Sequence, residues 1–160
     1  MERKLNVYVC IAFALVIAVT LGIIFGNSIK GPEESKEQSD EVVEVVRPVI
    51  DPKEEMSESE ISLLVRKMGH FVEYMALGIE CACFAYYIYK KLNLTGAVCA
   101  ALFCLLMADV DEFIQSFTGR GSAVADVLID LGGAVVGITV GFAASYAVTR
   151  IVMSKKKKAK

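Results

Sequence analysis

The stretch RKMGHFVEYMALGIE, residues 66–80, has the apolar spacing of a membrane helix but carries two bases, the only histidine and two glutamates. At about 100° per residue, its polar groups fall within roughly 80° of His70 and form one face. Ionisable residues at membrane depth normally face a bundle interior or a water-filled cavity, so other helices must supply partners for this face. Around His70, that face consists of Arg66, Lys67, Glu73, Tyr74, Leu77 and Glu80.

The composition predicts an integral membrane protein of one domain. Of 160 residues, 55% are hydrophobic, and the mean hydropathy is +0.52, which is too apolar for an ordinary soluble domain. The five cysteines are an odd number inside apolar runs, so buried free thiols are expected rather than a disulfide framework. No nucleic-acid partner is expected.

The first half of the chain divides into an anchor and a connector. Residues 7–26 are uncharged and long enough to cross a hydrocarbon core of about 30 Å, and a retained anchor is favoured over a cleaved signal peptide. Residues 28–60 hold eleven acids against four bases and all three prolines. Residues 42–50 could form a strand or dock on the membrane surface, but Pro48 limits their length, and a mobile acidic linker is favoured.

Three further helices are predicted, giving an all-α, integral membrane four-helix bundle. They begin near Ser62 or Lys67, near Leu94 and near Val124. Lysine and arginine residues flank the spans on one side, so both termini are predicted to be cytoplasmic. The predicted parts are an N-terminal transmembrane helix 1–27, an acidic extracytoplasmic linker 28–60, a three-helix core 61–150 and a basic cytoplasmic tail 151–160.

The last two predicted helices carry acids that should meet the His70 face at the outer end of the bundle. Asp126 and Asp130 lie one turn apart and continue into a tandem GxxxG face, which lets a neighbouring backbone approach closely and so turns these aspartates inward. Asp126 could instead cap its helix. Arg120, between two glycines, could pair with an acid or bind a phosphate or carboxylate. The third helix contributes Asp109, Asp111, Glu112 and Gln115.

The predicted pocket holds more acid than base. Six carboxyls face three bases. This excess leaves four explanations open: some carboxyls are protonated through burial, His70 carries a proton, a cation is bound, or several of these groups contact water. The bases are Arg66, Lys67 and Arg120. No HxxxH or CxxC spacing names a metal, so neither a metal nor a cofactor is predicted.

These motifs resemble the VanZ-like membrane protein family. The pattern K-x-x-H-F-x-E-Y occurs from Lys67, D-E-x-x-Q from Asp111, G-R at Arg120, and D-x-x-x-[DN] from Asp126 into a glycine-containing helix. The resemblance covers about residues 61–141. Ile114 replaces a histidine that many relatives have, which weakens a mechanism needing a second imidazole. The resemblance implies a link to reduced susceptibility to the glycopeptide teicoplanin, but no defined molecular activity.

We therefore expect a multi-pass protein of the cell membrane whose outward-facing polar pocket binds an anionic envelope lipid or glycolipid headgroup, with an oligomer left open. The alternative is a membrane-embedded hydrolase or transferase with His70 as acid or base, Glu73 or Asp126 orienting it and Arg120 stabilising an oxyanion. The sequence shows no obvious serine or cysteine nucleophile near the pocket. A purely structural polar network and a proton or ion relay also remain open. The predicted ligand-binding residues are Lys67, His70, Glu73, Tyr74, Asp111, Glu112, Gln115, Arg120, Asp126 and Asp130.

Overall fold

The computed structural model describes residues 5–53, 55–119 and 124–158, and these residues are almost entirely helical. No strand occurs within these three ranges. The described residues form five helices, α1 (Val7–Ser28), α2 (Pro32–Ile50), α3 (Glu58–Tyr89), α4 (Leu94–Phe117) and α5 (Val124–Lys158). This is one helix more than the four that were predicted.

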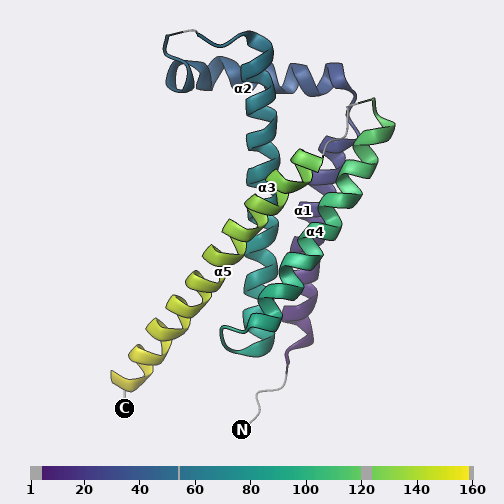
Figure 1. The fold of residues 1–160 in the computed structure, drawn as a ribbon. Coiled ribbons are helices and arrows are strands. Elements are labelled where there is room, and N and C mark those ends of the chain that lie inside the picture. The colour runs from purple at the N-terminus through teal and green to yellow at the C-terminus, as the bar shows by residue number, and fades with distance from the viewer. Residues whose placement is uncertain (1–4, 54, 120–123, 159–160) are drawn as a thin grey trace.

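Four of the helices run along the long direction of the molecule, and α2 lies across one end of them (Figure 1). The start of α1, the end of α5 and the turn between α3 and α4 lie at the opposite end from α2. That turn carries Lys90 and Lys91. The predicted grouping of basic segments at one end therefore agrees with the course of the chain, although Arg3 and Lys4 lie outside the described residues.

Three helices, α1, α3 and α5, are long and apolar enough to cross a membrane. The first has a mean hydropathy of 2.8 and contains no charged residue. A capping box starts α3, because the Ser57 hydroxyl accepts from the Glu60 N–H and the Glu60 carboxylate accepts from the Ser57 N–H. The chain is thus a helical membrane protein.

Glycines bring α3 and α5 into backbone contact, as the tandem GxxxG pattern predicted. A Cβ on Gly133 would collide with the carbonyl oxygen of Phe71, and one on Gly137 would collide with that of Met75. One turn further, a Cβ on Gly141 would lie 2.8 Å from the Ile79 carbonyl oxygen. The α5 face that continues from Asp130 is therefore fixed against α3.

The segment 28–60 differs from the mobile linker that was favoured, because most of it forms α2. Pro32 occupies the first turn, where its missing N–H costs nothing, and Glu33 and Glu34 follow at the positive end of the helix dipole. Pro48 is accommodated inside the last turn of α2. Small side chains at Ser35 and Ser39, followed by Val43, form the buried face of α2.

The helix α1 belongs to the core and is more than an anchor. Ile24 is fully buried, and it packs in one cluster with Tyr74 and Leu77 of α3 and with Cys104 of α4. The core therefore extends beyond the predicted range 61–150. At the other boundary, α5 continues to Lys158, so most of the predicted tail 151–160 is the end of a helix.

Candidate functional site

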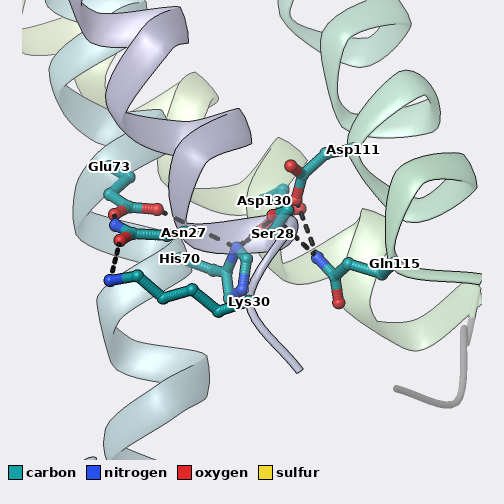
Figure 2. Close-up of polar contacts among 8 residues, drawn as sticks. All are labelled: Asn27, Ser28, Lys30, His70, Glu73, Asp111, Gln115 and Asp130. Carbon is teal, nitrogen blue, oxygen red and sulfur yellow. Dashed lines mark hydrogen bonds and ion pairs between the residues drawn. The ribbon is translucent and has the colours of Figure 1, made fainter. Parts of the chain in front are cut away.

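The site is centred on His70, whose ring lies among acids from two other helices. His70 Nδ1 lies 3.6 Å from Asp111 Oδ2 of α4 and 4.0 Å from Asp130 Oδ1 of α5. Asp111 is 0% exposed and Asp130 is 1% exposed. Figure 2 shows His70 with Glu73 on one side and the two aspartates on the other. The predicted convergence of α3, α4 and α5 is therefore present.

A second polar group approaches from the α3 and α1 side. Glu73 Oε2 lies 4.0 Å from His70 Nδ1, while Oε1 of the same carboxylate accepts from Asn27 Nδ2 at 2.6 Å. Lys30 Nζ donates to Asn27 Oδ1 at 3.0 Å and to Gln38 at 2.9 Å. The end of α1 thus orients Glu73 and brings a positive charge near it.

The α4 side is held by an amide. Gln115 Nε2 donates to Asp111 Oδ2 at 2.8 Å, one turn earlier on the same helix, and to Ser28 Oγ at 3.4 Å. Gln115 and Ser28 are both buried. Ser28 thus reaches the pocket from α1, which the sequence did not indicate, and its hydroxyl oxygen here accepts the hydrogen bond from Gln115.

The basic residues of α3 have different environments. Lys67 Nζ lies 2.9 Å from Asp126 Oδ1, so this pair joins α3 to the first turn of α5. Arg66 lines both the small cavity beside His70 and a groove on the other side of α3. Lys67 is thus paired with an acid, whereas Arg66 is half-buried and lines both spaces.

The remaining predicted residues are distributed as follows. Tyr74 is fully buried beside the cluster, and its hydroxyl has no hydrogen-bond partner among the described residues. Glu112 is buried on α4 with 7% exposure. Asp109 is exposed and lies away from the site. Side chains two positions apart on a helix point roughly 160° apart, and Asp111 faces inward. Arg120 lies outside the described residues.

Two spaces adjoin His70. The first is a cavity of about 10 Å³ lined by His70, Gln115 and Asp130, together with residues at the start of α5. A cavity of this size has room for about one water molecule. The second is a groove of about 540 Å³ between α2 and α3, which His70, Glu73 and Arg66 also line. Only the groove is large enough for a small organic ligand.

Sequence reasoning missed the contribution of α1. Thr20 Oγ1 donates to Glu80 Oε1 at 2.7 Å, and Asn27 and Ser28 enter the site as described above. Thr20 and Asn27 are seven residues apart and so lie on nearly the same helix face. This spacing of polar residues in an otherwise apolar span was the available signal that α1 packs against α3.

The fold and site define a helical membrane protein with a buried cluster of one histidine and several acids at one end of its bundle. The chain belongs to the VanZ/LLP1 family, whose family model matches residues 12–145. The match includes α1 and α2, so it extends well beyond the range 61–141 over which the resemblance was recognised. No curated protein and no solved structure matches the chain.

Proposed function

We propose that this protein is a multi-pass protein of the cell membrane that binds an anionic envelope lipid or glycolipid headgroup in the groove between α2 and α3. The observation that carries the proposal is the composition of this groove. Its volume of about 540 Å³ is within the range of small-molecule sites.

The groove has the two surfaces that a lipid requires. One part is apolar and could contact the acyl region next to the headgroup. The other part is polar, with His70, Glu73 and Asn27 at the inner wall and Gln38 of α2 opposite. The apolar part is lined by Val42, Val46, Ile50, Val65, Met68 and Val72.

Two bases give the groove its preference for an anion. Arg66 lines it directly, and Lys30 is held at its edge by hydrogen bonds to Asn27 and Gln38. A guanidinium suits a phosphate or carboxylate because its N–H groups can form paired hydrogen bonds. Of the bases proposed from sequence, Lys67 is paired with Asp126 and Arg120 lies outside the described residues, so we assign the main role to Arg66.

We further propose that α2 lies at the extracytoplasmic surface, with both termini in the cytoplasm. The basic residues at the α3–α4 turn and in the last turn of α5 support this orientation. A headgroup bound under α2 would then belong to the outer leaflet. Altered tolerance of teicoplanin-type glycopeptides is the phenotype we expect from binding an envelope precursor there.

Native mass spectrometry of the purified protein tests this proposal with phosphatidylglycerol as the added lipid and phosphatidylcholine as the neutral comparison. Arg66→Gln should weaken phosphatidylglycerol binding by roughly ten- to a hundredfold, which corresponds to losing one charged hydrogen bond. Lys91→Gln is the matched control, since Lys91 is an exposed base at the other end of the bundle. Equal phosphatidylglycerol affinity in both variants would refute the assignment.

An enzymatic role is the second candidate, because His70 lines both the groove and the small cavity. In this alternative, His70 would be the acid or base of a hydrolase or transferase, with Glu73 orienting it. A water molecule in the small cavity would be the nucleophile. A His70→Gln protein that is produced at normal levels and retains the full cellular phenotype would exclude this alternative.

A further inference from the structure

We propose that His70, Asp111 and Asp130 together bind one divalent transition cation, Zn²⁺ or Mn²⁺, between α3, α4 and α5. This proposal does not depend on lipid binding in the groove. It begins from three side chains that offer one ligand atom each, all within 4.8 Å of one another.

The separations between these atoms fit a shared ion. Two ligands that are each about 2.1 Å from a metal lie about 3 to 4.2 Å apart. The separations of 3.6 Å and 4.0 Å between His70 Nδ1 and the two aspartates fall in this range. Both separations are longer than the distance of about 2.8 Å between nitrogen and oxygen in a direct charged hydrogen bond.

Asp130 supplies an independent indication. Its Oδ1 faces His70, yet it has no hydrogen-bond partner within the described part of the chain, and the residue is 1% exposed. A buried carboxylate oxygen without a partner is costly. The glycine contact between α3 and α5 begins one turn later at Gly133, so the Asp130 side chain cannot turn to solvent without separating the helices. A cation would satisfy this oxygen where it stands.

The surroundings resemble the outer shell of a metal site. Gln115 donates to Asp111 Oδ2, and Asn27 donates to Glu73, the next nearest carboxylate. Hydrogen bonds of this kind fix the orientation of carboxylates that bind metals. The adjoining cavity, about 10 Å³, has room for a water molecule as a further ligand.

The donor set restricts the ion. One imidazole nitrogen with carboxylate oxygens suits Zn²⁺ or Mn²⁺, whereas a site for Mg²⁺ or Ca²⁺ would normally use oxygen alone. A divalent ion would also balance the charges of Asp111 and Asp130 in a region from which water is largely excluded. The competing explanation is that these carboxyls are protonated, and then no ion would bind.

Metal binding to the full-length protein in detergent tests the proposal. After treatment with a chelator, the protein is equilibrated with Zn²⁺ or Mn²⁺ and freed of unbound ions. The bound metal is then measured by inductively coupled plasma mass spectrometry. We expect about one ion per chain in the wild type. Asp130→Asn should weaken binding on the order of tenfold or more. Asp109→Asn is the matched control, since Asp109 is exposed on α4, and it should bind like the wild type.

A spectroscopic measurement keeps the test decisive if Asp130→Asn fails to fold. Pulsed electron paramagnetic resonance of the Mn²⁺ complex should show coupling to an imidazole nitrogen in the wild type, and His70→Gln should abolish it. The proposal is overturned if the wild type binds neither ion. It is also overturned if metal binding is unchanged in both Asp130→Asn and His70→Gln, or if the nitrogen coupling persists in His70→Gln.

Discussion

The backbone contact between α3 and α5 predicts that Gly137→Ala destabilises the protein. A Cβ at this position would collide with the Met75 carbonyl oxygen and would lie 2.8 Å from the carbonyl carbon. Restoring ordinary contact requires the helices to separate by roughly 0.6 Å or more, and a gap of that size forfeits about a quarter to a half of the dispersion energy along the contact. We expect a cost of about 1 to 3 kcal/mol.

The control for this substitution is Gly26→Ala in α1. Nothing lies within 4 Å of a Cβ built at Gly26, so the change tests the intrinsic helix preference of alanine without the collision. That preference favours alanine by up to about 1 kcal/mol in both variants. The difference between the two variants therefore isolates the cost of the α3–α5 contact.

Thermal unfolding in detergent, followed with a fluorogenic thiol reagent, measures this difference. Cys81 and Cys104 are buried, with exposures of 8% and 0%, so they should react when the helices separate. The midpoint of Gly137→Ala should fall several degrees below that of Gly26→Ala. Coincident midpoints would show that the α3–α5 contact is not limiting and would refute the reasoning.

Three other predictions address single contacts. A double-mutant cycle with Lys67→Met and Asp126→Asn should give a coupling of about 1 kcal/mol or less, reduced by salt in unfolding measurements, and a salt-independent value would contradict an ion pair. Thr20→Val should cost about 0.5 to 1.5 kcal/mol because Glu80 loses a hydrogen bond, whereas Thr20→Ser should restore stability; equal melting of the two variants would count against this bond. Pro48→Ala should slow hydrogen exchange of the last turn of α2, since alanine supplies the missing N–H, and unchanged exchange there would argue against helix at this position.

The sequence allowed much of the site to be predicted, because charges in apolar segments must turn inward. His70, Asp111 and Asp130 come from three helices, and each is an ionisable residue within a largely apolar part of its own helix. The grouping of these three residues could not be found from local spacing, because they are separated by long stretches of chain. Asp109 was misplaced because a face of about 160° is too wide to count as one side.

The helix α2 was missed for a different physical reason. Its composition is acidic and contains prolines, which favours solvated chain when it is considered alone. In the folded protein, α2 gains contacts with α3 through Ser35, Ser39 and Val43, and tertiary packing overrides weak local preference. The helix-start signal at Pro32, followed by Glu33 and Glu34, was nevertheless present in the sequence.

The glycine contact between α3 and α5 also links the position of the histidine cluster to that of the lysines at the end of α5. From Lys156 to Asp130 is about 39 Å along α5 at 1.5 Å per residue, compared with a hydrocarbon thickness of about 30 Å. If the terminal lysines rest among the phosphates of one leaflet, Asp130 reaches the opposite boundary. Because its glycines hold α5 closely against α3, the position of those lysines would then set the depth of the histidine cluster.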